Sequence, residues 1–264
     1  MELINIRASS LAELFDCPAR WEAKQIKGLR LACRSVTQIG TAFHGASAVY
    51  DSSRLHGGNP MTVDDALGVL ADAIWRPEQD VVWDADLQQR EAEKIGSGML
   101  VNYCERIAPS REYVAVEAKC ERLEIPDLGI ALTGQNDRIR KVGNRHGISD
   151  LKTGRTAVGT DGIAKTAGHG PQLGVYELLA EYSMGISIDL PAEIIGAQTA
   201  KKEQRVGTAE IPNAREMLTG TPEQPGMLQA ASMIIKSGVF FPNPRSMLCS
   251  KDWCPAWDTC KAHG

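Results

Sequence analysis

The chain has 264 residues, of which 43% are hydrophobic and 23% are charged, and its formal net charge is −4. This is the composition of a folded protein with one large or two small domains, and an acidic total disfavours tight binding of nucleic acid through bulk charge. No stretch approaches the roughly 20 apolar residues that span a bilayer. Arg7, Ser9 and Ser10 interrupt the first apolar run, so no signal peptide is recognisable and a cytoplasmic location is expected.

The first 108 residues are predicted to be mainly helical. Ser9 or Ser10 can cap a helix whose apolar residues recur at helical spacing, which predicts a first helix over 9–26. Gly, Pro and Asn residues separate the helices that follow. These are predicted over 37–53, 62–75 and 84–108.

From Arg111 onward, short β-branched segments predict strands instead. Gly143-Asn144 supplies a tight turn that joins two of them as a hairpin, and Pro171 suits the first position of a later helix. We expect an α/β fold in one domain, 1–264, with a helical region 1–108, a catalytic core 109–205 and a C-terminal part 206–264. Strands are predicted over 112–125, 130–142, 146–152 and 192–201, and helices over 170–184 and 226–238.

The predicted hairpin brings acidic residues and a lysine together. Asp150 and Lys152 are two apart in a strand and therefore share a face, and Asp137 lies on the partner strand. Two carboxylates can hold a hydrated Mg²⁺ together with phosphate oxygens, and a lysine can stabilise charge that develops in a transition state. Taken alone, Asp-x-Lys is more often a solvated strand face, so the hairpin needs support from other residues.

Four residues outside the hairpin add that support. His44 lies on a predicted helix upstream of the sheet, although an isolated helix histidine is more often structural. Gln172 and Tyr176 are four apart and share one helix face. Glu117, on a neighbouring predicted strand, is a third acid of lower weight.

The segments GTAFH, GQNDRI, GISDLKTGR and PQLGVYELL, in this order, resemble the RecB-type branch of the PD-(D/E)XK nuclease superfamily. The resemblance implies a restriction-endonuclease-like core with a mixed central sheet flanked by helices. It implies His44, Asp137 and Asp150 as metal ligands and Lys152 as the catalytic lysine. Gln172 and Tyr176 would then position substrate or order water, and Glu117 is not firmly part of the motif.

Cys249, Cys254 and Cys260 crowd the last sixteen residues, and three thiolates need a fourth ligand to hold zinc or an iron–sulfur cubane. Cys17, followed by proline and then an aromatic residue, is the best candidate. It resembles the N-terminal cysteine motif of the iron–sulfur members of the same branch, which include AddB-type subunits and RecB-like exonucleases of CRISPR systems and phages. The resemblance implies a C-terminal iron–sulfur segment that holds a 4Fe–4S cluster. Zinc is the alternative, and free buried thiols are the third possibility.

The remaining cysteines, Cys33, Cys104 and Cys120, are expected to be small buried hydrophobes. Trp253 and Trp257 are expected to shield the cluster rather than to contact DNA.

The function expected from these features is a Mg²⁺- or Mn²⁺-dependent DNA nuclease, an exonuclease on single-stranded ends with little sequence specificity. The alternatives are a structure-specific or processing endonuclease in a larger complex, for example in CRISPR adaptation, and a non-catalytic module that binds DNA ends. Arg138, Arg155 and Lys165 are candidates for phosphate contacts. The expected partner is DNA, with a recombination, replication or CRISPR-type protein as a further partner, and no membrane. The chain has no P-loop motif, so unwinding would need such a partner.

Overall fold

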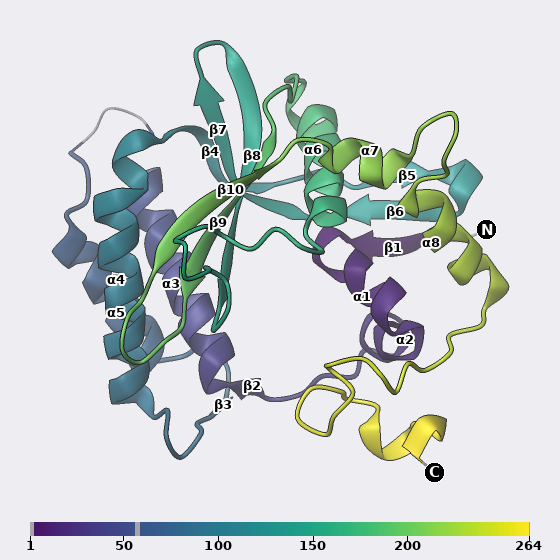
Figure 1. Cartoon of the computed structure of the whole chain (residues 1–264), viewed down its shortest axis with the longest axis horizontal. Coiled ribbons are helices and arrows are strands. Elements are labelled where there is room, and N and C mark those ends of the chain that lie inside the picture. Colours follow the sequence, from purple (N-terminus) through teal and green to yellow (C-terminus); the bar gives the residue numbers. More distant parts are fainter. Residues whose placement is uncertain (1–2, 56–58, 264) are drawn as a thin grey trace.

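A mixed five-stranded sheet forms the centre of the computed structural model, which describes residues 3–55 and 59–263 (Figure 1). The strand order is β10-β9-β8-β7-β4. β8 and β9 run parallel and the other neighbours run antiparallel. Parallel neighbours need a crossover connection, which α6 (Gly170–Met184) provides. The strands are β4 (Glu112–Lys119), β7 (Gln135–Val142), β8 (Arg145–Gly154), β9 (Ala192–Gln198) and β10 (Val206–Ile211).

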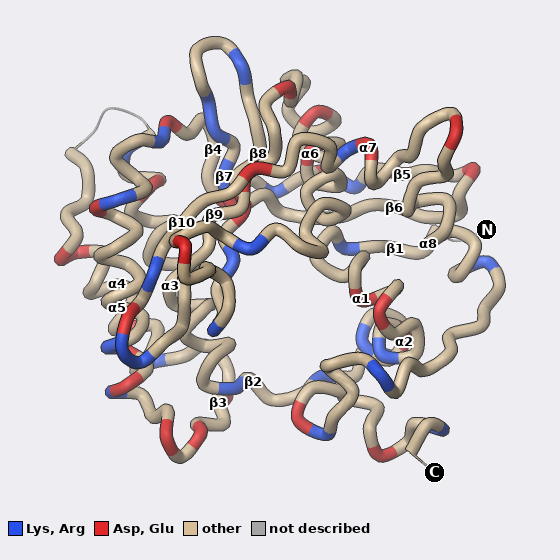
Figure 2. The backbone as a smooth tube through the Cα atoms, in the orientation of Figure 1, with Lys and Arg blue, Asp and Glu red and all other residues tan. Residues whose placement is uncertain are grey.

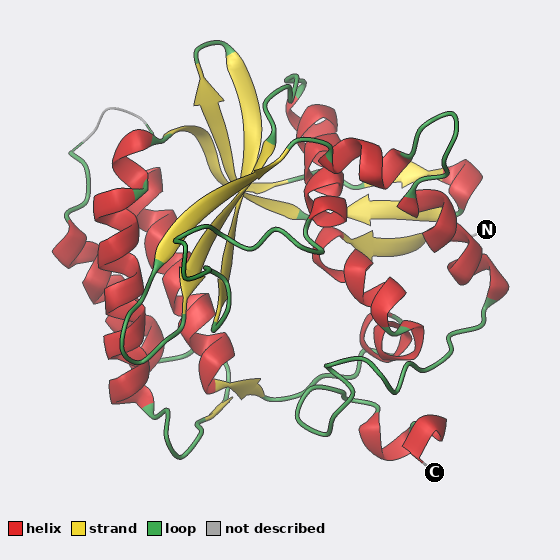
Figure 3. Ribbon diagram, viewed as in Figure 1, coloured by secondary structure: helices red, strands yellow, loops and turns green. Residues whose placement is uncertain are grey.

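Helices cover both faces of this sheet (Figure 3). α6 packs on one face, and a layer of three helices lies over the opposite face: the first and the last of them contact the strands, and the middle one packs on these two. Ile194 and Ile195 are both fully buried, the first in the core beneath α6 and the second in the core of the other helical layer. A strand buried on both faces has a continuous apolar run, as in AEIIGA. The expected mixed sheet flanked by helices is confirmed. The three helices are α3 (Ser35–Ser52), α4 (Val63–Trp75) and α5 (Gln89–Arg106).

A second sheet of three strands has the order β1-β6-β5. The single strands predicted over 112–125 and 130–142 are wrong, because each segment divides and passes from one sheet to the other. At Gly134, between β6 and β7, an added Cβ would lie 2.9 Å from the Tyr176 ring. This close approach of the Gly134 backbone to α6 coincides with the break in the predicted strand. The expectation of a mainly helical N-terminal region did not include β1. The strands are β1 (Ile4–Arg7), β5 (Leu123–Ile125) and β6 (Ile130–Thr133).

The helix predicted over 9–26 is two helices, α1 (Leu11–Asp16) and α2 (Pro18–Gln25). Cys17 separates them in an extended conformation, with φ −147° and ψ 93°. Proline has no N–H for the helix and disfavours helical geometry in the residue before it. The break therefore comes from the Cys17-Pro18 pair itself.

The C-terminal part returns to the N-terminal helices after α7 (Ala214–Thr219) and α8 (Met227–Ser237). Figure 1 shows this last segment beside α2. Asn243 donates through its side chain to the Asp16 carbonyl at 2.9 Å, and its main-chain N–H points to the Cys17 sulfur at 3.4 Å. β10 lies beyond the core boundary predicted at residue 205, yet it is an edge strand of the central sheet. In the part of the chain that the structure describes, no helix is long and apolar enough to cross a membrane.

Glu177 is a buried acid on α6 that is expected to make stability depend on pH. Burial raises its pKa from 4.5 to about 7, and Arg215, 3.5 Å away, offsets part of that rise. The folded chain therefore holds this proton more tightly than the unfolded chain, and stability falls as the pH rises from about 4.5 to about 7. Glu177→Gln is expected to stabilise the protein more at about pH 8 than at about pH 5. The two increases in the free energy of unfolding should differ by about 1–2 kcal/mol. Urea titrations measure this, and an equal effect at both pH values would contradict it.

Candidate metal centre

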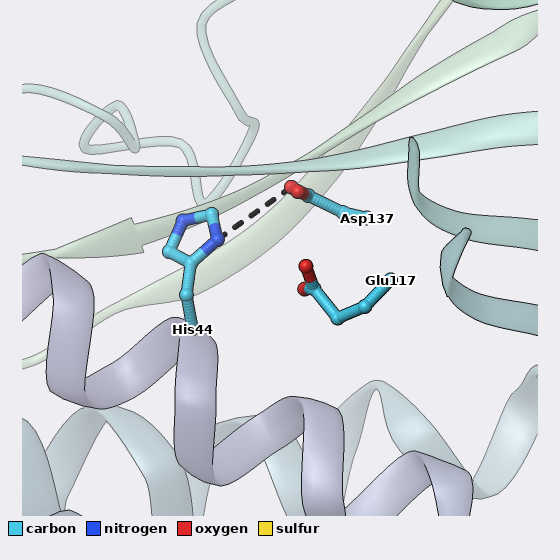
Figure 4. A group of neighbouring side chains, drawn as sticks. All are labelled: His44, Glu117 and Asp137. Atoms are coloured by element: carbon cyan, nitrogen blue, oxygen red, sulfur yellow. Dashed lines mark ion pairs between the residues drawn. The ribbon is translucent and has the colours of Figure 1, made fainter. Parts of the chain in front are cut away.

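Three side chains from separate elements converge beside the central sheet. His44 comes from α3, Glu117 from β4 and Asp137 from β7, and their candidate ligand atoms all lie within 4.8 Å of one another. His44 Nδ1 is 3.6 Å from Asp137 Oδ2 (Figure 4). Neutral imidazole and carboxylate oxygens are donors that divalent metals accept in proteins. This group could therefore hold a metal ion.

The register of the sheet explains why Glu117 and Asp137 meet. Val116 pairs with Arg138 and Ala118 with Asn136, which leaves Glu117 directly opposite Asp137. Glu117 has φ 50°, and it is the one described non-glycine residue with positive φ. Such a conformation costs about 1–3 kcal/mol and persists where surrounding structure enforces it, often at functional sites. Here Gln135 donates to the Glu117 carboxylate at 2.5 Å.

His44 reaches the sheet because α3 lies close to β8. At Gly40 an added Cβ would lie 2.6 Å from the Thr153 hydroxyl, so a larger residue would push the helix away. Burial lowers the pKa of His44 to about 4. Its ring is therefore neutral at physiological pH and keeps the lone pair that a metal ligand needs.

Asp150 and Lys152 lie on β8, next to this group. Lys152 Nζ is 2.5 Å from Asp150 Oδ2, and the aspartate is only 1% exposed. Gln172 Nε2 lies 3.5 Å from Asp150 Oδ1 and 3.0 Å from the Tyr176 hydroxyl, to which it donates. The structure thus brings together every catalytic and metal-ligating residue singled out in the sequence, with Asp150 held by Lys152 and Gln172.

The site disfavours the ionised form of its three carboxylates. Burial raises the pKa values of Glu117, Asp137 and Asp150. The Leu151 main-chain N–H donates to Asp137 at 2.8 Å and lowers the pKa of that carboxyl, while Lys152 lowers the pKa of Asp150. Crowded buried carboxylates of this kind are stabilised by a cation, so the residues fit a divalent metal.

The phosphate contact expected for Arg138 is wrong. Its side chain is fully buried and points away from solvent. Its Nε donates to Asp51 at 2.7 Å, and another guanidinium nitrogen lies 3.4 Å from Glu117. Ser47 and the Asp137 carbonyl accept further hydrogen bonds from the same guanidinium. Arg138 therefore joins α3, β4 and β7, the three elements that carry His44, Glu117 and Asp137.

The Arg138 partners on α3 were missed in the sequence, although a signal exists. His44, Ser47 and Asp51 are spaced at i, i+3 and i+7, so they form one polar stripe along the helix. Such a stripe on a buried helix indicates a polar network. Tyr103, from α5, completes it by donating to Asp51 at 2.6 Å.

Arg138→Met is expected to lower the free energy of unfolding by about 3–5 kcal/mol, since it leaves the Asp51 carboxylate buried without its cation. Urea unfolding measures the change. Arg76→Met is the matched control, because Arg76 also pairs with an aspartate but on the exposed surface of α4, where such pairs contribute about 0–1 kcal/mol. Equal, small effects of both substitutions would contradict a structural role of the buried pair.

The other two basic candidates differ from Arg138. Arg155 and Lys165 lie on the loop between β8 and α6, and both side chains are exposed. Their position leaves them available to a phosphate backbone, and the contact itself stays a prediction.

Cys17, Cys249, Cys254 and Cys260 line one cavity, which also contacts His263. Burial and then the other three thiols raise the pKa of Cys249, which reflects their proximity. His263 Nε2 is 3.3 Å from the Cys249 sulfur, and its ring stacks on Trp257 at 3.7 Å between centroids. The structure thus brings the two ends of the chain together at the four cysteines. Of the remaining cysteines, Cys33 and Cys104 are buried and Cys120 is partly buried.

The chain is similar to known proteins in sequence and in fold. Residues 6–261 match the family model described as the PD-(D/E)XK nuclease superfamily. The crystal structure of a "Putative exonuclease" from Eubacterium rectale is similar with a TM-score of 0.58 at 13% identity, covering 94% of this chain and 87% of that one. The structure of SSO0001 gives a TM-score of 0.44 at 12% identity, over 100% and 89% of the two chains. A search of the curated proteins found no match.

Proposed function

Since this chain belongs to the PD-(D/E)XK nuclease superfamily, we propose that it is a Mg²⁺- or Mn²⁺-dependent deoxyribonuclease of the RecB-type branch. The observation that supports this most directly is the convergence of His44, Glu117 and Asp137 next to the Asp150–Lys152 pair. These residues come from four elements, and an ordinary solvated strand face would not gather side chains from a helix and three strands around one buried aspartate.

Each residue of the site has a distinct task in this proposal. Asp137, Asp150, Glu117 and the neutral His44 ring hold the metal. A bound Mg²⁺ or Mn²⁺ supplies a more acidic water and neutralises charge on the phosphoryl group. Lys152, fixed by Asp150, presents its ammonium group to the phosphate as negative charge develops on it.

The helix α6 supplies the polar side chains that lie beside Asp150. Tyr176 is buried, which raises the pKa of its phenol and keeps it protonated. It accepts a hydrogen bond from Gln172 and keeps that amide facing Asp150. Gln172 is therefore placed to order a water or a phosphate oxygen beside the aspartate.

The proposed substrate is a single-stranded DNA end, cut with little sequence specificity. Arg155 and Lys165 would contact the phosphate backbone, which positions a strand without reading its bases. The description of the Eubacterium rectale protein as a "Putative exonuclease" is consistent with action on ends. A recombination, replication or CRISPR-type protein would supply the DNA end, and the cytoplasm is the proposed compartment, where the seven free thiols stay reduced.

The four converging cysteines are proposed to hold a 4Fe–4S cluster. Among the described residues, no three of their sulfurs lie within 4.8 Å of one another. Four thiolates on one zinc ion, at Zn–S of about 2.3 Å, would lie about 3.8 Å apart. A 4Fe–4S cubane holds its four thiolates farther apart than one zinc ion does, so this spacing is compatible with the cluster, and zinc stays the alternative. When bound, the cluster would cross-link the two ends of the chain beside the nuclease core.

End-labelled single- and double-stranded oligonucleotides, incubated with Mg²⁺ or Mn²⁺, test the proposed activity. The expected result is stepwise shortening of the single strand only, abolished by chelation of the metal. Internal cuts would favour the processing endonuclease, and DNA binding without cleavage would favour the non-catalytic module.

His44→Ala is expected to raise the metal concentration needed for half-maximal cleavage about 10- to 100-fold, the scale on which groups that support a metal site act. The urea unfolding midpoint should change little. An unchanged metal requirement would make His44 a core histidine.

A further inference from the structure

A cavity of about 250 Å³ lies between α2, the segment that leads to β2 (Cys33–Arg34) and the C-terminal cysteine segment. Figure 2 shows Lys and Arg residues gathered on α2 and along this segment. Among the described residues that line the cavity, Asp252 is the single carboxylate, so the cavity wall carries a net positive charge. The four cations of its wall are Arg20, Lys24, Arg30 and Arg34.

Trp253 forms part of the same wall and is 40% exposed. Trp253 is not among the described residues that line the cavity of the four cysteines, and its expected shielding of a cluster stays a prediction. Its main chain is fixed instead: Arg20 Nε donates to the Trp253 carbonyl at 2.9 Å. Arg20 in turn pairs with Glu13 at 2.6 Å. An exposed indole held beside cations can stack on a planar ring that carries negative charge.

Arg30 is the cation in this wall whose charge is least compensated. Lys24 and Arg20 share Glu13, and Arg34 pairs with Asp84 and Asp252. Arg30 donates to the main-chain carbonyls of Lys24 and Leu29. Within residues 3–55 and 59–263, it has no carboxylate partner, so it is free to bind a phosphate.

One face of α3 connects this cavity to the metal centre. Thr37 lines the cavity, and Thr41 and His44 follow at i+4 and i+7, so all three share a face. Thr37 and Thr41 are exposed along it. Seven residues of helix rise by about 10 Å, which corresponds to about three stacked nucleotides at about 3.4 Å each.

We propose that this cavity binds the single strand of DNA on its way to the metal centre, with a base stacked on Trp253 and a phosphate bound by Arg30. The proposal rests on the proposed function, because it assigns the occupant as the substrate strand. The site recognises a planar base and a neighbouring phosphate, so it gives affinity without sequence preference. It also makes the C-terminal cysteine segment part of the DNA-binding surface.

Binding of fluorescein-labelled oligothymidylate, measured by anisotropy with the metal chelated, tests the site without cleavage. Trp253→Leu should weaken binding about 5- to 150-fold, the loss expected for one stacked base. Arg30→Gln should lower the slope of log affinity against log salt by about 0.7, one phosphate contact on a single strand. The matched controls are Trp75→Leu and Arg76→Gln, because Trp75 is likewise exposed and both lie on or next to α4, outside the cavity.

Hydrolysis of bis(4-nitrophenyl) phosphate, a small diester that does not reach the cavity, separates this inference from the proposed function. With Trp253→Leu and Arg30→Gln, the rate on the small diester should equal that of the wild type, while KM for oligonucleotide rises. If neither variant weakens oligonucleotide binding, the inference is wrong even where the enzyme cleaves DNA. If the wild type cleaves neither substrate, the proposed function fails and the binding data still decide the cavity. Iron content is measured in the wild type and in every variant. Arg30 lies outside the cysteine segment, so Arg30→Gln still tests the cavity if Trp253→Leu loses iron.

Discussion

Lys152→Ala is expected to lower kcat for oligonucleotide cleavage about 10²–10³-fold, the usual effect of removing one group that stabilises transition-state charge. Lys152 is the only cation paired with Asp150 in the described structure, at 2.5 Å. The Lys152 side chain is 24% exposed, so its ammonium can contact the buried aspartate and also a phosphate that enters the site. Single-turnover cleavage of end-labelled DNA with saturating metal measures the change in the chemical step.

Asp150→Asn should have an effect at least as large, because it removes a negative charge from the proposed metal site and weakens the partner that orients Lys152. The asparagine has the same shape and can keep the contact to Gln172, so the fold should survive. Lys141→Ala is the matched control: Lys141 also lies on the central sheet beside an acid, Glu112, but at the far end of β7. Wild-type rates in both Lys152→Ala and Asp150→Asn would refute the assignment of this pair.

Cys17→Ala is expected to abolish the brown colour, iron and acid-labile sulfide of protein purified without oxygen. It should also lower stability strongly. A link between Cys17 and the C-terminal cysteines closes a loop that contains most of the chain, and such closures restrict the unfolded state by about 5 kcal/mol in the chain-entropy treatment of cross-links. Iron and sulfide analysis, visible absorption and thermal unfolding measure these effects.

Cys120→Ala is the control for this experiment. Cys120 is a partly buried thiol that accepts a hydrogen bond from Asn136 and lies outside the group of four. Its replacement should leave iron and colour unchanged. A colourless wild-type protein that contains zinc would overturn the cluster, and full iron content in Cys17→Ala would show that Cys17 is not a ligand.

The local order of the chain could be predicted from its sequence, because short-range patterns determine it. The Gly143-Asn144 turn joins β7 and β8 as expected, and the register that follows places Asp150 and Lys152 on one face. Pro171 lies in the first turn of α6, as its missing N–H suggests. The expected helices over 37–53 and 170–184 are α3 and α6 to within two residues.

Other features depended on contacts between distant segments. The break of the predicted strand near Gly134 requires the ring of Tyr176 from α6, and no local pattern contains that contact. Arg138 follows Asp137 in sequence and looks like a surface cation, but its partner Asp51 comes from a helix far upstream. Only packing of α3 on the sheet could reveal that the arginine is buried.

The sequence by itself therefore determined the types of the main elements and which residues carry chemical groups, since propensity, turn residues and spacing act over a few residues. The tertiary structure decided how those groups meet. It placed Glu117, an acid of low weight in the sequence, in the group that could hold a metal, because strand register sets it opposite Asp137. It also placed Trp253 in a basic cavity, because the last segment of the chain folds back on α2, a long-range contact that composition and periodicity do not encode.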